Sequence, residues 1–193
     1  MRIAEIKRDT NETKIRLKLN IDGNGMANID TGLPFFDHML VSFAKHSKFD
    51  LDLNVKGDID VDYHHTIEDT GIVLGKAFNN SLNDRSGIER FGYSYVPLDE
   101  ALSRVVVDIS GRPFLYFNVN FPRSDDGSNI NPYLFEEFFR GFVNNALVTL
   151  HIDCIRGNNS HHIIESIFKS FAKSLFLSSR ISGKDIPSTK GVL

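Results

Sequence analysis

The sequence predicts an α+β fold of two quasi-equivalent halves, each a small sheet with two helices, joined without a linker. Segments with a hydrophobic residue at every second position, typical of half-buried strands, alternate with segments of helical periodicity. Each half has a helix that opens near a proline, Pro34 or Pro132, with aromatic residues behind it. Each half also ends with a helix that begins His-His-x-x-Glu, so internal duplication explains the pattern better than chance.

The first half is expected to contain strands, a helix, a further strand and a second helix. Hydrophobic and polar residues alternate from Ile15 to Ile21, as in a strand with one buried face. Pro34 predicts a helix start, because the N–H that proline lacks has no partner in the first turn. Residues 51–55 then form a short strand, residues 56–63 a polar loop, and the second helix begins near His64. Two glycines, Gly71 and Gly75, weaken the expectation for the middle of that helix.

The second half repeats this order. Its expected elements are strands at 91–97, 102–110 and 114–121, a polar loop at 124–131, a helix capped by Asn131-Pro132, a strand at 147–155, a loop at 156–160, a helix from His161 and an extended polar tail from Ser178. The whole chain is thus expected to be one domain over residues 1–193, with halves near 1–90 and 91–193.

Composition excludes several classes of protein. A chain of 193 residues, 41% of them hydrophobic, suits one compact domain. The single cysteine, Cys154, excludes a disulfide scaffold. A net charge of −3 provides no field for gathering nucleic acid. No apolar run approaches the ~18 residues of a membrane span, and the N-terminus lacks a signal-peptide core. We therefore expect a cytoplasmic protein that binds neither nucleic acid nor membrane.

The repeated His-His-x-x-Glu string has a defined geometry on a helix. Residues four apart share a face, so His64 pairs with Glu68 and His161 with Glu165. The second histidine of each pair, His65 or His162, points about 100° away, because a helix has 3.6 residues per turn. Two imidazoles at that angle do not easily bind one ion. Either they serve different ions, or one of each pair is structural.

The number of candidate donors favours two ions. The candidates are His38, His64, His65, Glu68, His151, His161, His162 and Glu165. A first-row ion takes at most about six donors, so this set overfills one site. Shared between two ions, the donors leave positions open for water or substrate, as catalysis needs. Nitrogen and oxygen donors without thiolate suit Mn, Fe, Co, Ni or Zn and do not by themselves select manganese.

Each residue also has a structural interpretation. A lone histidine such as His38 or His151 is more often a half-buried structural residue than a ligand. His46 lies near the end of its helix, where an imidazolium suits the helix dipole. One His-His-x-x-Glu string is a weak signal, since polar residues commonly gather where helices begin. Two copies at repeat-related positions shift the balance to metal binding, because the dipole favours acids but not imidazolium at a helix start.

A second set of residues suits an anion such as a phosphate monoester. Guanidinium forks and ammonium groups bind phosphate, although most surface cations are simply solvated. The candidates are Arg90, Arg112, Lys169, Ser188, Thr189 and Lys190. Glu12 is either an acid or base at the site or a solvated loop carboxylate, and the residue types alone do not choose.

Eight ordered motifs make the chain recognisable as a whole. They are R-x-T-x-E-T at 8–13, F-D-H-M-L at 36–40, H-H-T-x-E-D at 64–69, R-F-G with V-P-L-D-E-A-L within 90–102, D-x-S-G-R-P at 108–113, L-H-I at 150–152, N-S-H-H-x-x-E-x-x-F-K at 159–169 and S-T-K-G-V-L at 188–193. Through them the chain resembles, over essentially its whole length, the imidazoleglycerol-phosphate dehydratases of histidine biosynthesis.

The resemblance implies a role for each candidate. Two Mn²⁺ per active site would be held by His38, His64, His65, Glu68, Glu137, His161, His162 and Glu165. The phosphate would be held by Arg90, Arg112, Lys169, Ser188, Thr189 and Lys190. Glu12 would move protons, and His46 would contact substrate. The resemblance further implies a large octahedral homo-oligomer built from trimers, with active sites between neighbouring subunits.

The chain departs from the family pattern at two positions. Many members have a metal-binding histidine directly before Phe138-Phe139, where this chain has Glu137, so Glu137 and His151 compete for the role of eighth donor. Tyr63 stands where many members have aspartate. No phosphatase domain is fused to the chain, which predicts the monofunctional form.

The expected reaction converts D-erythro-imidazoleglycerol phosphate to imidazole acetol phosphate. The proton to be lost is not next to a carbonyl, so the imidazole ring, deprotonated with metal help, would expel the hydroxyl and give a diazafulvene-like intermediate. A carboxylate would then remove the neighbouring proton. Two other functions remain open from the residues alone: a dinuclear metallohydrolase of phosphate esters, and a non-catalytic assembly protein whose metal ions join its subunits.

Overall fold

The computed structural model describes residues 1–122 and 130–193. In the first half the elements are β1 (Ile3–Asp9), β2 (Thr13–Asn20), β3 (Ala27–Asp30), α1 (Pro34–Ser47), β4 (Asp50–Gly57) and α2 (His64–Ser81). In the second half they are β5 (Phe91–Leu98), β6 (Ala101–Asp108), β7 (Phe114–Asn118), α3 (Leu134–Ala146), β8 (Thr149–Arg156) and α4 (Ser160–Ser179). The two halves repeat one order of strands and helices.

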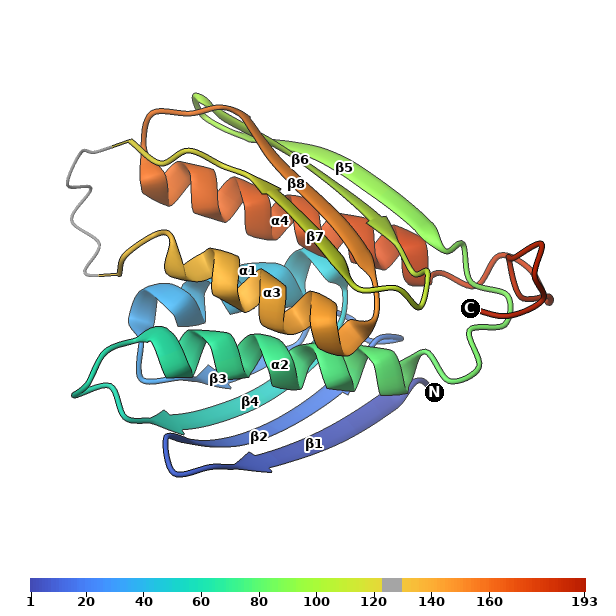
Figure 1. The fold of residues 1–193 in the computed structure, drawn as a ribbon, viewed down its shortest axis with the longest axis horizontal. Helices are drawn as coiled ribbons and strands as arrows, with labels where there is room; N and C mark the ends of the chain where they lie inside the picture. The colour runs from blue at the N-terminus through green and yellow to red at the C-terminus, as the bar shows by residue number, and fades with distance from the viewer. Residues whose placement is uncertain (123–129) are drawn as a thin grey trace.

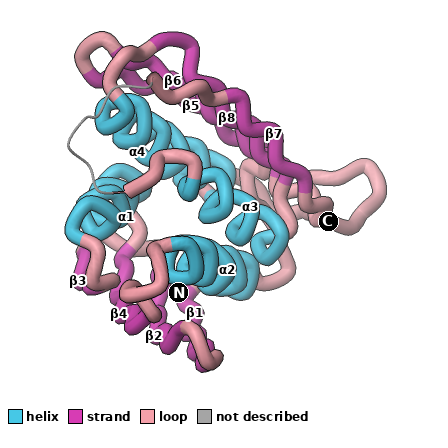
Figure 2. Tube along the Cα trace, turned by 60° about the vertical axis from the view of Figure 1, so that its left-hand side comes forward, coloured by secondary structure: helices cyan, strands magenta, loops and turns pink. Residues whose placement is uncertain are grey.

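Two four-stranded sheets enclose a layer of four helices (Figures 1 and 2). The strand orders are equivalent, β1-β2-β4-β3 and β5-β6-β8-β7. In each sheet only the last pair, β3–β4 or β7–β8, is parallel. This architecture confirms the predicted α+β class with two quasi-equivalent halves. No helix in residues 1–122 or 130–193 has the length and apolar character needed to cross a membrane.

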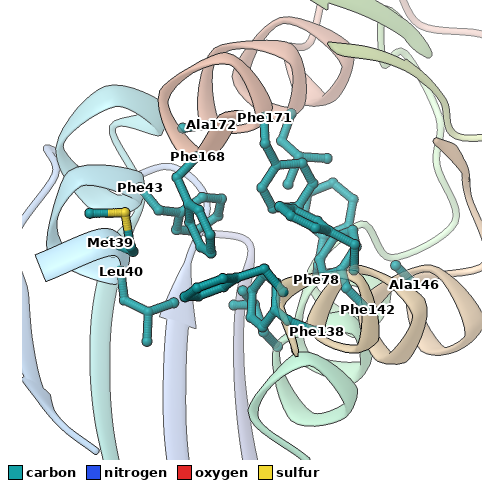
Figure 3. Close-up of a cluster of buried hydrophobic side chains, with 14 of the residues drawn as sticks. Met39, Leu40, Phe43, Phe78, Phe138, Phe142, Ala146, Phe168, Phe171 and Ala172 are labelled. Atoms are coloured by element: carbon teal, nitrogen blue, oxygen red, sulfur yellow. The ribbon is translucent and has the colours of Figure 1, made fainter. Parts of the chain in front are cut away.

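The core lies between the sheets and is rich in phenylalanine. The strands alternate as predicted, since Ile15, Leu17 and Leu19 of β2 are buried while their neighbours are exposed. Among the helices, Phe138, Phe142, Phe168 and Phe171 pack with Phe43 and Phe78 (Figure 3). Aromatic pairs in such edge and stacked arrangements add to the stability gained by burial alone.

Several predicted boundaries were wrong by a few residues. Helix α3 begins at Leu134, because Asn131 to Tyr133 form a turn in which the Asn131 side chain accepts a hydrogen bond from Tyr133 N at 3.1 Å. Helix α4 begins at Ser160, since Asn159 caps it by accepting from His162 N. That helix continues to Ser179, beyond the predicted start of the tail. Strand β7 is shorter than expected, and most of the predicted loop 124–131 lies outside the described residues.

Candidate functional site

The first donor group joins α1 to α4. His38 Nε2 lies 3.5 Å, and His161 Nε2 3.1 Å, from Glu165 Oε2. Within residues 1–122 and 130–193 this is the one set of three potential ligands whose donor atoms all lie within 4.8 Å of one another. The predicted pairing of His161 with Glu165 is present, and His38 joins it because the start of α1 packs beside the start of α4.

Lys169 and His46, two further predicted residues, lie near this first donor group. Lys169 Nζ is 2.8 Å from Glu165 Oε1, one helical turn away. Burial disfavours ionisation of Glu165, but the contacts with Lys169, His38 and His161 together outweigh it, so its pKa is lowered. Burial, with repulsion from Lys169 and Lys173, lowers the pKa of His46. Lys169 thus faces a carboxylate in this structure, and His46 lies in the field of two lysines.

The second donor group lies where α2 begins. His64 Nε2 is 3.1 Å from Glu68 Oε2, as the helical spacing predicts. The ring of His65 is turned by 85° from that of His64, and its Nδ1 lies 3.0 Å from Asp58. Its Nε2 lies 3.7 Å from Glu12 Oε1. The hydrogen bond with Asp58 is the main cause that raises the pKa of His65.

The second histidine of α4 has similar surroundings. His162 is turned by 88° from His161, and its Nδ1 lies 2.7 Å from Glu100 Oε2. Its Nε2 lies 3.9 Å from Asp99 Oδ2. The hydrogen bond with Glu100 is the main cause that raises the pKa of His162. In both pairs the two imidazoles therefore face different groups.

A buried carboxylate fixes the turn that carries Glu12. Asp69, which follows Glu68 in α2, accepts a hydrogen bond from Arg8 Nη2 at 2.8 Å and a short one from Thr13 Oγ1. Asp69 is 6% exposed, so this contact replaces water that the carboxylate has lost. The β1–β2 turn, which carries Glu12, is therefore anchored to α2, the helix that begins with His64 and His65.

The two candidates for an eighth donor lie in different places. Glu137 is on α3, where its carboxylate lies 3.4 Å from Arg140 Nε. Gly141, one turn later, packs so closely on α2 that a Cβ there would be 2.8 Å from Glu68 O. Glu137 is therefore on the face of α3 that meets the start of α2. His151 lies instead on β8 between Phe114 and Tyr116, on the side of the sheet away from the core. Tyr63 precedes α2 and packs on the core.

Five of the predicted anion-binding residues gather beside the C-terminal tail, whereas the sixth, Lys169, lies with the first donor group. Arg90 makes a double contact with Asp108, at 2.7 Å and 3.1 Å, and its Nη1 donates to Pro187 O at 2.9 Å. Arg112 lies 3.9 Å from Asp108 and its side chain is 64% exposed. Ser188 Oγ accepts from Lys190 N at 3.2 Å, so Ser188 to Lys190 form a compact turn, with Thr189 exposed between them.

The donor groups and this cationic group lie at opposite ends of the helix layer (Figure 1). The histidines are in the first turns of α2 and α4, whereas Arg90 and the tail follow the last turns. Helix α4 has 20 residues, which corresponds to about 30 Å. One chain therefore separates its predicted metal ligands from all of its predicted phosphate ligands except Lys169, which contacts Glu165.

The sequence did not predict three of the acidic residues that contact the site residues: Asp58, Glu100 and Asp108. Asp58 falls in the predicted loop 56–63, Glu100 between two predicted strands, and Asp108 near the end of a predicted strand. None of the three had a local signal, because each contact joins segments that are separate in the sequence.

The duplicated α+β scaffold, with histidine and carboxylate side chains at the starts of two equivalent helices, has the donor chemistry of an enzyme that acts on a small molecule. The family model described as imidazoleglycerol-phosphate dehydratase matches residues 31–175. The chain belongs to the imidazoleglycerol-phosphate dehydratase family. It is therefore a hydro-lyase of histidine biosynthesis.

Similar proteins of known name agree with this assignment. Imidazoleglycerol-phosphate dehydratases from Thioalkalivibrio sulfidiphilus and Acidithiobacillus ferrooxidans are 55% and 53% identical over 196 residues, covering 100% of this chain and 98% of each relative. The crystal structure of the Staphylococcus aureus enzyme has a TM-score of 0.84 at 39% identity, covering 93% of this chain and 99% of that one. The Pyrococcus furiosus enzyme, crystallised with (S)-C348, gives 0.85 at 34% identity, covering 97% and 100%.

Proposed function

We propose that the chain dehydrates D-erythro-imidazoleglycerol phosphate to imidazole acetol phosphate with two Mn²⁺ per active site. The observation that carries this proposal is the group of His38, His161 and Glu165, which two helices bring together. Three nitrogen and oxygen donors leave positions of an octahedral ion free for a substrate ring nitrogen.

The remaining donors fit a second ion. His64 and Glu68 repeat the pair found on α4, and Glu137 lies on the helix face that meets them. His65 and His162 turn their rings away from these pairs, so each is available to another ion. Imidazole and carboxylate donors accept manganese, although they accept other first-row ions too.

The chain's own residues would supply proton transfer and binding. When bound, the ions would favour the deprotonated imidazole ring of the substrate. Within residues 1–122 and 130–193 the ion-pair partner of the Glu12 carboxylate is His65, at 3.7 Å, so Glu12 is available to remove the proton from the carbon next to the departing hydroxyl. Arg112, largely exposed, presents its guanidinium to the phosphate.

The separation of the two groups supports active sites between subunits. A substrate that reaches both the metal ions and the tail-side cations Arg90 and Arg112 would find them on different copies, since one helix length divides them within a chain. The second sheet also has an aromatic outer face, with Phe91, Tyr93, Tyr95, Phe114 and Tyr116 exposed. The outer face of the first sheet carries Glu5, Lys7, Arg16 and Lys18 instead. An octahedral homo-oligomer of trimers would cover the aromatic face.

The proposal also places the chain in the cytoplasm, because a phosphate ester does not cross a membrane unaided. The test is an assay of the purified protein for ketone and inorganic phosphate before and after chelation. We expect the protein to form ketone without releasing inorganic phosphate. Chelation should abolish ketone formation, and Mn²⁺ should restore it. Release of phosphate would favour the metallohydrolase, and unchanged ketone formation after removal of all metal would refute metal dependence.

A further inference from the structure

Within the described part of the chain, the second histidine of each pair has one ring nitrogen in close contact with a carboxylate and the other only in distant contact with one. Nδ1 of His65 lies 3.0 Å from Asp58 Oδ2, and Nδ1 of His162 lies 2.7 Å from Glu100 Oε2. The carboxylates that face the Nε2 atoms, those of Glu12 and Asp99, are farther away, at 3.7 Å and 3.9 Å. The first histidines, His64 and His161, differ, because it is their Nε2 that meets a glutamate of their own helix.

The two carboxylates reach equivalent nitrogens from positions that are not equivalent. Asp58 lies in the loop between β4 and α2, whereas the equivalent loop between β8 and α4, residues 157–159, contains no carboxylate. Glu100 lies instead in the turn between β5 and β6. Duplication alone would have placed both carboxylates in one segment. The contact between a carboxylate and Nδ1 is made from a different segment in each half. We therefore take the contact, and not the segment that supplies it, to be the feature that both halves require.

Backbone hydrogen bonds tie the segments of both carboxylates to neighbouring loops. Asp58 N donates to Glu12 O at 3.1 Å, which ties its loop to the β1–β2 turn. Glu100 Oε1 accepts from the backbone N of Asn158 at 3.3 Å and of Asn159 at 3.1 Å, which ties the β5–β6 turn to the loop before α4. Each carboxylate therefore meets its histidine from a fixed position.

A neutral imidazole has one donor and one acceptor nitrogen. A carboxylate at Nδ1 requires the proton there, which leaves the lone pair on Nε2. We propose that Asp58 and Glu100 are positioning residues that make Nε2 the metal-binding nitrogen of His65 and His162. This inference rests on the metal dependence proposed above.

The test measures Mn²⁺ affinity of the full chain by calorimetry. Glu100→Gln keeps an oxygen for the backbone of residues 158–159 but presents an amide donor to Nδ1, which forces the proton onto Nε2. Asp58→Ala removes the acceptor from His65. Asp60→Ala, an exposed acid in the same loop, is the matched control for lost charge.

We expect Glu100→Gln and Asp58→Ala to weaken Mn²⁺ binding by about 10–100-fold, with the melting temperature of the metal-free protein unchanged. Asp58→Glu should recover part of the affinity, and the control should bind as the wild type does. Wild-type affinity in both test variants would overturn the inference, as would a loss matched by a lower metal-free melting temperature. A wild-type protein that binds no Mn²⁺ would instead refute the proposed function.

Discussion

Glu12 is more weakly engaged than the two glutamates that share a helix with the histidines. Glu68 and Glu165 each lie 3.1 Å from a histidine of their own helix. Glu12 lies 3.7 Å from His65 Nε2, and its side chain is 54% exposed. A carboxylate that is held in position, but does not make a close hydrogen bond, is available for proton transfer.

Glu12→Gln should therefore separate proton transfer from metal binding. The amide keeps the shape of the side chain but cannot take a proton, so we expect turnover to fall by about 10²–10⁴-fold. Manganese content, measured by elemental analysis, should equal that of the wild type. Turnover within a few-fold of the wild type would remove Glu12 from the chemistry.

The surroundings of His46 predict a pH effect on stability. Its pKa is lowered by burial and then by Lys169 and Lys173, so between the lowered value and about 6.5 the unfolded chain binds more protons than the folded one. This histidine therefore costs stability as the pH falls below about 6.5. His46→Gln removes that cost.

The comparison is of melting temperatures for wild type and His46→Gln at pH 7.5 and pH 5. We expect acidification to lower the melting temperature of the wild type by more than that of the variant. Parallel losses in the two proteins would show that His46 carries no such effect.

At the residue scale, the sequence predicted contacts made within one helix and missed those made between segments. The spacing in His-His-x-x-Glu gives the pairs on α2 and α4 directly. The approach of Asp58 to His65 depends on how a loop folds back, and that of His38 to Glu165 on how α1 packs against α4. Neither arrangement has a local signal.

At the scale of elements, α2 and α3 pack unusually closely. A Cβ on Gly71 would lie 2.2 Å from Phe138 O, and one on Gly75 would lie 2.4 Å from Phe142 O. The sequence presented these glycines as weak points of a helix, whereas α2 is continuous through both. Their small size lets α3 approach the helix that carries His64 and Glu68.

Gly71→Ala should force the two helices apart. The clash is with backbone, which cannot rotate away, so we expect a loss of about 1–3 kcal/mol in the free energy of unfolding. Gly183→Ala is the matched control, because nothing lies within 4 Å of a Cβ there. Denaturant unfolding compares the two, and equal stability of both variants would contradict the close packing.

Element order was predictable and element ends were not. Alternation in β2 and proline at the start of α1 are local signals, and both elements were found. Strand β3 was not singled out, because its four residues have no buried side chain and pair only through β4. The start of α3 was misplaced because the turn at Asn131 looks in sequence like a helix cap.

For the whole molecule, the separation of donors from cations predicts that inactive chains can complement each other. Glu12→Gln and Arg112→Ala change exposed side chains in the two separated groups. If active sites form between copies, co-assembly of the two variants places intact groups together in some sites. We expect part of the wild-type activity to return on co-assembly, whereas sites within one chain would leave the mixture as inactive as its components.

The count of bound manganese tests the central claim most directly. Protein equilibrated with Mn²⁺ and freed of excess should contain two ions per chain by elemental analysis, because one chain supplies donors for two. The same protein stripped by chelation should contain none and form no ketone. Protein that retains no manganese after equilibration with Mn²⁺, and yet forms ketone from imidazoleglycerol phosphate, would contradict the account.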